Sequence, residues 1–567
     1  MAKYDNFSRE ELIELLQKQD KELTRKKYGL VWDKEKEPEQ VVLDCANKLP
    51  ILKNVAQKDI KTNDDDYNIM IEGDNYHALQ VLNYTHKGKI DVIYIDPPYN
   101  KGNKDFIYND RYVDKEDGYR HSKWLNFMEK RLDLAKELLS DTGVIFISID
   151  ENEEANLKLL CNKIFNNNCV GTFIWRKKQG GGQADDYFVT EHEYILVYCK
   201  NKRFFKWIDD EIDIKEEDFK YSDEKGKYKL VKLEKWGNTS RREDRPTMYY
   251  PIKQPNGKKY YPIAPDGNDG RWRIGKSRME DIYKYGLIEW KENKKGAMTP
   301  YEKIYWSEDD IKVIKERSIL FDLAFTSDGT NTLTNIFGKK DVFKNPKSEI
   351  LVYNLISHAG TTDSTVLDFF AGSGTTGHAV LELNRQDGGN RRFILCTNNE
   401  GNIATEVCYP RVQKVIQGYN KNGKEEFIEG LGGNLKYFKT DFIANSKNKT
   451  QTKINLAKQC SEMLCLKTGI YNPIDEENPC FRLFDNNKHN KFLCVYFDFF
   501  GNNINNFINK IRALNGEKFV FMFSLDENVD KSLFEGIENI KIEPIPQKIL
   551  DVYKKIAKEH IKGDNND

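Results

Sequence analysis

The fold of this chain is constrained most by strand-like runs that end in turns carrying reactive side chains. The stretch "DVIYIDPPYN" (91–100) begins as a buried strand of Val, Ile and Tyr, and it stops at an acid, two prolines and a tyrosine. The stretch "VLDFFAGSGTTGHAV" (366–380) reads as a strand, a glycine loop and a helix. Strands and helices alternate around both, so we predict an α/β fold with a mostly parallel sheet and helices on its faces.

Changes in composition divide the chain of 567 residues into five expected segments. Residues 201–335 are rich in Lys, Arg, Tyr and Trp and carry Pro-Asn-Gly and Pro-Asp-Gly turns, which predicts an inserted, hairpin-rich module. The Ser-capped pattern at 8–23 predicts a helix. The expected segments are an N-terminal helical region (1–65), a first α/β half (66–200), the insert (201–335), a second α/β half (336–440), and a C-terminal region (441–567) that starts with a linker.

Bulk charge does not identify a partner, because 89 basic residues nearly balance 90 acidic ones. Any nucleic-acid surface must therefore come from local patches. The N-terminus has no signal-peptide core, and no apolar run is long enough to cross a membrane. The ten cysteines include no C-x-x-C pair, so we expect a cytoplasmic protein without a disulfide framework or a metal site.

The glycine loop predicts a cofactor site. Gly372, Gly374 and Gly377 satisfy the G-x-G-x-x-G pattern, so a dinucleotide has to be considered beside a plain strand-to-helix turn. However, Asp368 lies inside the preceding strand, and the first acid after the next strand is Glu400, which is late for a ribose contact. A cofactor with one ribose, an amino-acid tail and no phosphate fits better. S-adenosylmethionine has that shape, and the Asp368 carboxylate would hold its ammonium group.

The Asp-Pro-Pro-Tyr turn predicts chemistry on an amino group. The Asp96 carboxylate and a carbonyl held rigid by Pro97 and Pro98 are two acceptors that would draw the hydrogens of an exocyclic amine and make its nitrogen more nucleophilic. Tyr99 offers a flat face on which an extruded base stacks. The sequence therefore predicts direct methyl transfer governed by alignment and proximity. The alternative interpretation is a turn that simply ends a strand.

These motifs resemble a known family. "DPPY" before "FAGSGTT", with a long insert between them, is similar to the β-class of DNA amino-methyltransferases, and the leading Asp resembles the adenine-N6 branch. "KYGLVWDKE", "IEGDNYHALQVL" and "FKNPKSEILVYNLI" resemble the modification (Mod) subunits of type III restriction–modification systems. The resemblance implies a doubly wound S-adenosylmethionine-dependent methyltransferase fold with circularly permuted strand order, an inserted target-recognition domain (201–335) and a C-terminal α/β assembly domain (441–567).

The resemblance also implies roles for individual residues. Asp96, Pro97, Pro98 and Tyr99 form the catalytic motif. Those implied to bind the cofactor are Asp74 near its adenine, Lys347 near its carboxylate, Glu400 (or Asn398 or Asn399) at its ribose, and Asp368, Phe370, Gly372, Gly374 and Thr375 at its methionine end. The loop 100–112 is interpreted either as a cover for the flipped base or as an ordinary surface loop.

Double-stranded DNA is the expected substrate, and the basic stretches 240–246 and 271–278 are its expected contacts. The residues chosen are Arg241, Arg242, Arg271, Arg273, Lys276 and Arg278. The resemblance further implies a homodimer through the C-terminal region and a bacterial or phage protein bound to the nucleoid through DNA. Two alternatives stay open, a modification subunit that works with a restriction (helicase–nuclease) subunit and a stand-alone methyltransferase. The recognition sequence is not predicted, because no general code maps such a region to bases.

Rival functions remain open on sequence alone. An RNA or protein-glutamine methyltransferase usually shows Asn before Pro-Pro-Tyr, and an N4-cytosine enzyme usually shows Ser. An NAD-dependent oxidoreductase would rest on the glycine loop alone, and a DNA-binding module with a dead site conflicts with the intact "DPPY". Carbon-5 methylation of cytosine needs a Pro-Cys nucleophile, and Pro479–Cys480 lies far from both motifs in the sequence.

Overall fold

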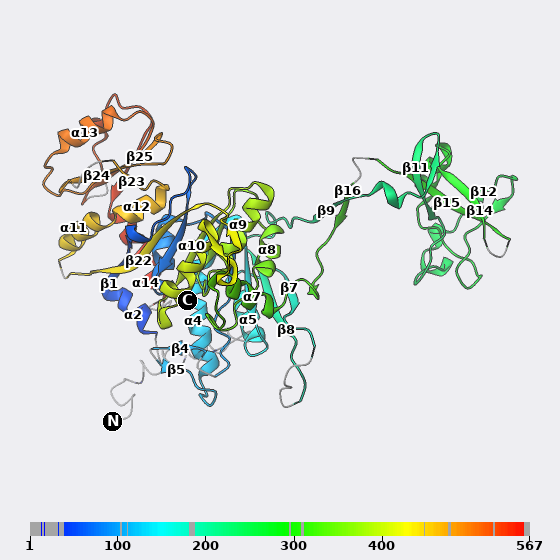
Figure 1. Cartoon of the computed structure of the whole chain (residues 1–567), viewed down its shortest axis with the longest axis horizontal. Coiled ribbons are helices and arrows are strands. Elements are labelled where there is room, and N and C mark those ends of the chain that lie inside the picture. Colours follow the sequence, from blue (N-terminus) through cyan, green and yellow to red (C-terminus); the bar gives the residue numbers. More distant parts are fainter. Residues whose placement is uncertain are drawn as a thin grey trace. The chain divides into compact units, whose positions relative to one another are not determined.

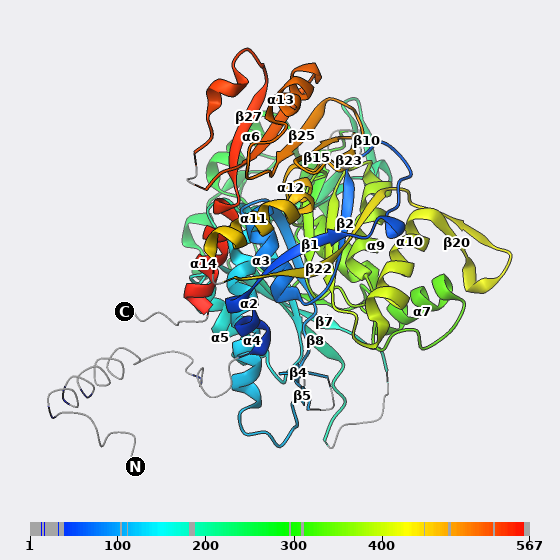
Figure 2. The same ribbon diagram turned by 90° about the vertical axis from the view of Figure 1, so that its left-hand side faces the viewer.

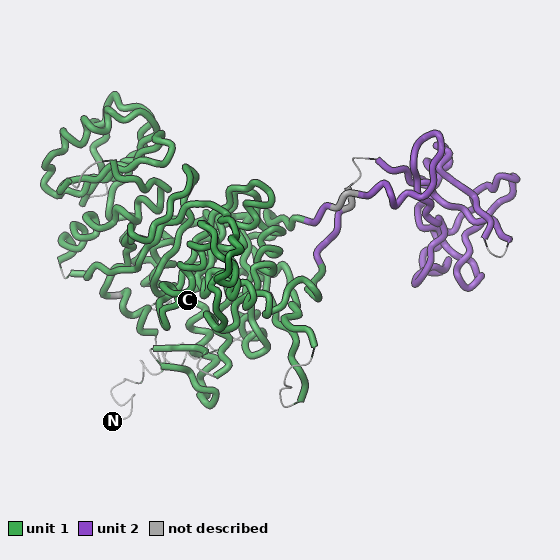
Figure 3. Tube along the Cα trace, in the orientation of Figure 1, with its two compact units in different colours: residues 1–208, 317–567 green, residues 209–316 purple. Residues whose placement is uncertain are grey.

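The computed structural model describes residues 9, 13, 16, 32 and 39–560, apart from 103–104, 110, 181–186, 294–295, 308–310, 447, 475–477 and 526–527. The helix predicted for 8–23 therefore falls largely outside the described residues. The chain forms two compact units (Figure 3). The first combines residues 1–208 with 317–567, and the second is 209–316.

A large sheet organises the first unit, and in the described part of the chain it has ten strands (Figure 1). In spatial order they are β1 (Lys48–Asn54), β22 (Asn434–Ala444), β2 (Tyr67–Glu72), β19 (Arg392–Thr397), β18 (Thr365–Asp368), β3 (Ile90–Ile95), β6 (Leu139–Ile149), β8 (His192–Cys199), β7 (Cys169–Arg176) and β17 (Ile319–Leu320). The six strands from β22 to β6 are parallel, whereas β1 and β8 run antiparallel to their neighbours. Strands from both halves of the chain interleave, so the mostly parallel fold with permuted order is confirmed.

Helices cover both faces of this sheet (Figure 2). Helices α3 (Asn75–Thr85), α4 (Arg120–Leu138) and α5 (Glu154–Ile164) pack on one face, and α8 (Glu349–Ser357), α9 (Thr375–Asp387) and α10 (Tyr409–Gln417) pack on the other. Along β3, Ile93 and Ile95 belong to the first core and Val92 and Tyr94 to the second. Successive strand side chains point to opposite faces, and a strand buried on both faces is apolar throughout. This explains the unbroken run before Asp96.

Two segment boundaries differ from the prediction at the edge of the sheet. The region expected to be helical up to residue 65 contains α2 (Gln40–Asn47), but it continues as the edge strand β1. All seven residues of β1 pair with β22, which runs on to Ala444 through the expected linker, and α11 (Lys449–Gln459) follows closely. An edge strand exposes part of its surface and carries charged residues there, such as the ion-paired Lys53 and Asp441. These charges interrupt the apolar pattern from which a strand is predicted.

The C-terminal region forms a second sheet and folds back onto the first. Its strands are β23 (Asn472–Pro473), β24 (Phe481–Asp485), β25 (Lys491–Tyr496), β26 (Glu517–Phe523) and β27 (Ile540–Ile545), with helices α12 (Ser461–Thr468), α13 (Ile504–Ala513) and α14 (Gln547–His560). From α14, Tyr553 donates a hydrogen bond of 2.7 Å to the carbonyl of Pro50. Residues 441–560 therefore belong to the first compact unit. Cys480 of the Pro-Cys pair is buried in the core of this second sheet.

The second unit is a small, separate domain. A sheet of β10 (Tyr221–Asp223), β11 (Gly226–Lys232), β15 (Met298–Tyr305) and β14 (Ile288–Glu292) lies with helix α6 (Lys276–Lys284) around a core that includes Leu233, Trp272 and Ile282. The Pro-Asn-Gly turn joins the short hairpin of β12 (Ile252–Lys253) and β13 (Lys259–Tyr260). The unit is narrower than the predicted insert 201–335, because β17 and α7 (Thr326–Phe337) belong to the first unit. In neither unit does a described helix have the length and apolar character needed to cross a bilayer.

Candidate active site

The two sequence motifs meet at one edge of the sheet. Strand β18, which leads into the glycine loop, pairs in parallel with β3, which leads into the Asp-Pro-Pro-Tyr turn. Strands β2 and β19 pair in the same way, and they lead to Asp74 and Glu400. The carboxyl ends of parallel strands share one edge of a sheet, and α/β proteins bind their ligands there. The structure thus brings the predicted catalytic and cofactor segments together.

Hydrogen bonds fix the Tyr99 side chain and the Pro98 carbonyl of the Asp-Pro-Pro-Tyr turn. The Tyr99 hydroxyl donates to Asp96 Oδ1 at 2.8 Å. The indole of Trp124, on α4, donates to the Pro98 carbonyl at 2.7 Å. Among the described residues no donor is assigned to the Pro97 carbonyl. Its expected role as an acceptor for a substrate amine stays a prediction.

Lys347 joins the catalytic turn. Its ammonium donates to the Tyr99 hydroxyl at 2.6 Å and lies 3.4 Å from Asp96 Oδ1, and its side chain is only 10% exposed. The backbone carbonyl of Lys347 accepts a bond of 3.3 Å from Thr375 in the glycine loop. Lys347 therefore links the two motifs. Its expected contact with a cofactor carboxylate stays a prediction.

Glu193 is a site residue that the sequence analysis missed. It lies in β8, and its Oε2 accepts hydrogen bonds from Lys347 at 2.5 Å and from Tyr99 at 3.1 Å. Its Oε1 accepts from Lys177 at 3.2 Å. The sequence feature that could have revealed it is the acid within the apolar run "HEYILVYC", since a buried acid in an apolar strand needs a partner.

The charges of this cluster set one another's ionisation. Burial raises the pKa of Asp96, and Lys347 opposes that rise while Glu193 adds to it. Burial would also raise the pKa of Glu193, but Lys347 and Lys177 outweigh it and lower the pKa to about 2. Lys347 is desolvated as well, yet Asp96 and Glu193 raise its pKa. At neutral pH the cluster therefore contains an ionised Glu193 and a protonated Lys347.

The glycine loop has the backbone conformation that its sequence predicts. Gly372 and Gly374 have φ angles of 50° and 78°, in the left-handed region that other residues avoid. A Cβ at Gly374 would lie 3.1 Å from the sulfur of Cys408. Arg411, on α10, is fully buried and donates to Thr375 Oγ1 at 2.8 Å and to Ser373 Oγ at 3.1 Å. This anchor was not predicted.

Asp368 is the buried acid beneath this loop. It is 3% exposed and accepts hydrogen bonds of 2.5 Å from the Thr376 hydroxyl and 2.9 Å from the backbone N–H of Phe370. Burial raises the pKa of Asp368 to about 7, and the nearby charge of Asp96 contributes. No basic side chain among the described residues pairs with it. A buried carboxylate of this kind fits a cationic ligand group.

The remaining predicted cofactor residues lie along the same edge. Asp74 caps α3 by accepting from the N–H of Tyr76 at 2.7 Å and lies 3.6 Å from the guanidinium of Arg131. Phe370 packs its ring against that of Phe127, with centroids 5.9 Å apart. Glu400 is exposed just after β19 and accepts a long bond of 3.4 Å from Tyr112. Their cofactor contacts stay predictions.

The predicted DNA contacts lie in the second unit, where most of the basic side chains are exposed but already paired. Arg241 pairs with Asp266 at 2.7 Å and Arg242 with Asp269 at 3.1 Å. Arg273 and Arg278 share Glu302, at 2.9 and 3.1 Å, and Lys276 is exposed at the start of α6.

The prediction that Arg271 contacts DNA requires a correction. Arg271 is only 7% exposed and donates to the Thr239 carbonyl, so its charge stabilises the unit's own loop.

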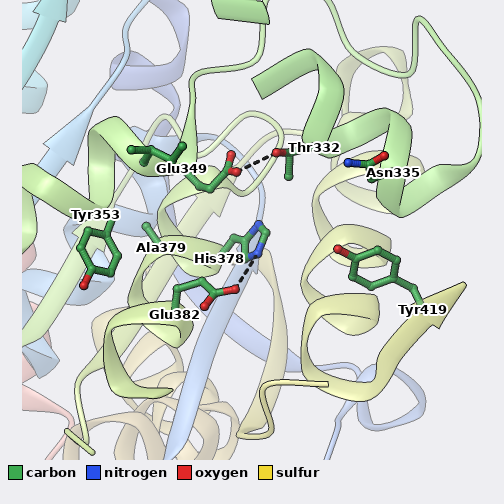
Figure 4. Close-up of a pocket in the computed structure, with 9 residues that line it drawn as sticks. Thr332, Asn335, Glu349, Tyr353, His378, Ala379, Glu382 and Tyr419 are labelled. Atoms are coloured by element: carbon green, nitrogen blue, oxygen red, sulfur yellow. Dashed lines mark hydrogen bonds and ion pairs between the residues drawn. The ribbon is translucent and has the colours of Figure 1, made fainter. Parts of the chain in front are cut away.

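A cavity of about 440 Å³ is lined mainly by residues of α7, α8 and α9. Figure 4 shows Glu349, His378 and Glu382 along one wall with Tyr419 opposite them. Arg411 connects this wall to the loop, because its guanidinium lies 3.3 Å from His378 Nδ1 and 3.9 Å from Glu349. None of the Asp-Pro-Pro-Tyr residues lines this cavity, so we place the reaction at the sheet edge instead.

Comparison with known proteins agrees with this geometry. The family profile described as "DNA methylase" matches residues 90–407, which include both motifs. The type III restriction-modification enzyme EcoPI Mod subunit of Escherichia phage P1 is 32% identical over 447 residues, covering 71% of this chain and 68% of that protein. The type II methyltransferase M.KpnI of Klebsiella pneumoniae is 36% identical over 358 residues, covering 59% and 82%. The EcoP15I Mod subunit of Escherichia coli is 30% identical over 447 residues, covering 68% and 67%.

The family profile spans more than half of the chain, and the relatives match most of their own length. The resemblance drawn from the motifs is therefore confirmed, and an NAD-dependent oxidoreductase is not supported. The buried Asp368 and the glycine loop fit the amino-acid end of S-adenosylmethionine, the methyl donor expected for such an enzyme. The chain belongs to the DNA methylase family and is an S-adenosylmethionine-dependent DNA methyltransferase.

Proposed function

We propose that this chain methylates the N6 amino group of an adenine flipped out of double-stranded DNA, as the modification subunit of a type III restriction–modification system. The observation that carries the proposal is the pairing of β3 with β18. This pairing sets the Asp96 carboxylate and the Pro97 carbonyl beside the glycine loop. The similarity to two type III Mod subunits supports the assignment to such a system.

The residues at the sheet edge fit the proposed cofactor. Bound S-adenosylmethionine supplies an electrophilic methyl group. Asp368 would hold the ammonium group, since it is buried, acidic and without a basic partner among the described residues. Asp74 and Glu400 would hold the adenine and ribose end, because they follow the next two strands along the edge. Lys347 would lie near the carboxylate of the cofactor, with Glu193 holding its ammonium.

The catalytic turn acts by accepting hydrogen bonds from the target amine. Asp96 Oδ and the Pro97 carbonyl would each accept one of its two N–H groups, which makes the nitrogen more nucleophilic. Asp96 must be ionised for this role. Tyr99 is partly exposed and offers its ring to the flipped base. The amine loses one proton after transfer, and Asp96 is the nearest acceptor for it. Alignment and proximity supply the remaining acceleration.

The base is identified by a direct assay. Purified protein is incubated with unmethylated DNA and labelled S-adenosylmethionine, and the DNA is digested to nucleosides. We expect the label in N6-methyladenine and none with the Asp96→Ala variant. Label in N4-methylcytosine would overturn the choice of base. Label in RNA but not in DNA would overturn the choice of substrate. Long-read sequencing of DNA from expressing cells then gives the sequence context.

Further proposals concern the partners. The 209–316 unit would contact the target through exposed arginines such as Arg242 and Arg278, which requires each to exchange a carboxylate for a phosphate or a base. We propose a homodimer formed through the C-terminal region, association with a restriction subunit, and a cytoplasmic location on DNA. Light scattering on the purified chain should give twice the chain mass of 66.3 kDa. A monomer at micromolar concentration would contradict the dimer.

A further inference from the structure

Glu193 shares its partners with the catalytic acid. The Tyr99 hydroxyl lies 2.8 Å from Asp96 Oδ1 and 3.1 Å from Glu193 Oε2. The Lys347 ammonium lies 3.4 Å from Asp96 Oδ1 and 2.5 Å from Glu193 Oε2. Every group that binds Asp96 in the cluster thus has Glu193 as a second acceptor within reach.

We infer that Glu193 is a positioning residue, which keeps the Lys347 ammonium and receives the Tyr99 hydroxyl when the target amine binds Asp96. The inference rests on the proposed function, since it assumes that Asp96 receives an amine. Glu193 itself does not touch the base or the methyl group. It acts through the two side chains that would otherwise occupy Asp96.

The hydroxyl proton of Tyr99 shows why a second acceptor is needed. The Lys347 ammonium donates to the Tyr99 oxygen at 2.6 Å, so the tyrosine proton must point to a different acceptor. Asp96 and Glu193 are the two acceptors in range. When the substrate amine occupies Asp96, the proton can turn to Glu193. A buried hydroxyl left without an acceptor would oppose substrate binding.

The lysine is already held by Glu193 rather than by Asp96, at 2.5 Å against 3.4 Å. Glu193 is 9% exposed on its side chain and Asp96 is 28% exposed, so the more buried acid holds the ammonium and the more accessible acid faces the substrate. Lys177 binds the other oxygen of Glu193 and fixes the orientation of the carboxylate. If Glu193 lost its charge, Asp96 would be the remaining carboxylate paired with Lys347. The ammonium would then compete with the target amine.

The decisive experiment is a pH profile of kcat/KM for DNA at saturating S-adenosylmethionine. The titratable groups that face Asp96 are Lys347, Glu193, Tyr94, Tyr99 and Asp368. In Glu193→Gln the negative charge beside Asp96 is lost, and we expect the Lys347 ammonium to move closer to Asp96. Both changes favour the ionised form of Asp96, so the acid limb should move to lower pH. Meanwhile kcat/KM at neutral pH should fall by about tenfold or more, because a charge-assisted contact is lost.

Matched variants separate positioning from structural damage. Glu193→Asp keeps the charge with a shorter reach, so it should return the acid limb to the wild-type position and recover part of the rate. Glu191→Gln alters a neighbouring acid that pairs with Arg176 at 3.5 Å, and it should behave as wild type. A loss of rate in Glu193→Gln with an unmoved acid limb would mean a structural role and would overturn the inference. An unchanged rate would overturn it too.

The wild-type protein in the same assay distinguishes the two proposals. Methyl transfer by the wild type together with an unmoved acid limb in Glu193→Gln rejects the role of Glu193 and leaves the proposed function intact. Absence of transfer from the wild type to any DNA substrate rejects the proposed function, and the role of Glu193 falls with it.

Discussion

The pH dependence of cofactor binding is the sharpest consequence of the buried Asp368. Burial holds its pKa at about 7 in the cofactor-free chain, so a large share of the molecules carry a neutral carboxyl near neutral pH. An ammonium group binds only the ionised form well. Pairing with the cation lowers the pKa of the carboxyl, so binding releases a proton. The affinity for S-adenosylmethionine should therefore rise as the pH increases through 7 and level off above it.

The magnitude follows from the ionised fraction. With a pKa of about 7, about half of the Asp368 carboxyls are ionised at pH 7, about one in eleven at pH 6, and about one in a hundred at pH 5. The dissociation constant should therefore rise about fivefold from pH 7 to pH 6, and about a further ninefold from pH 6 to pH 5. The cofactor's own α-amino group titrates near pH 8, so the useful range lies below about pH 7.

Isothermal titration calorimetry measures this directly. Titrations between pH 5 and 7 give the change of the dissociation constant with pH. Repeating them in two buffers with different ionisation heats gives the number of protons released on binding, which we expect to be about half a proton at pH 7. The matched variant Asp368→Asn keeps the size of the side chain and removes the charge. It should bind weakly and without this pH dependence. Equal affinity across the range, or the same slope in the variant, would refute the assignment of Asp368 to the ammonium.

Three further predictions concern the loop and the catalytic turn. Asp96→Asn should lower methyl transfer by at least about a hundredfold while calorimetry still shows cofactor binding, so an active variant would contradict the acceptor role. Gly374→Ala should weaken cofactor binding by about 1–2 kcal/mol, because a left-handed residue is strained and its Cβ meets Cys408. Gly388→Ala, at the other end of α9 with φ 70° and open space, should leave the affinity unchanged, and equal losses in both would exclude close packing as the cause. Arg411→Met should lower the thermal unfolding temperature and the cofactor affinity together, whereas a loss of stability alone would show that Arg411 does not support the loop.

The structure also changes how the 209–316 unit is interpreted as a DNA-binding surface. Sequence spacing placed six basic residues in two patches, but it could not show that Arg271 points inward. It also could not show that Asp266, Asp269 and Glu302 neutralise four of the others. These acids lie in other segments of the unit, and only folding brings them to the arginines. Local charge along the chain therefore overstates the positive surface.

The sequence by itself determined the central strands, such as β3 and β18, and the turns and residues that follow them. Continuous apolar runs predict buried strands, and Pro-Pro and glycine pairs predict turns, because both effects depend on neighbouring residues. Asp96 and Asp368 could therefore be identified from the local sequence. The tertiary structure decided the partners. Glu193 acquires its role mainly from Tyr99 and Lys347, and Arg411 supports Ser373 and Thr375, all of which lie more than thirty positions away. Likewise, β1 with the end of β22 becomes a strand by pairing at an exposed edge. The local sequence does not show which residues such side chains contact, because the free energy that fixes the contacts comes from burial and from charges that meet only in the folded chain.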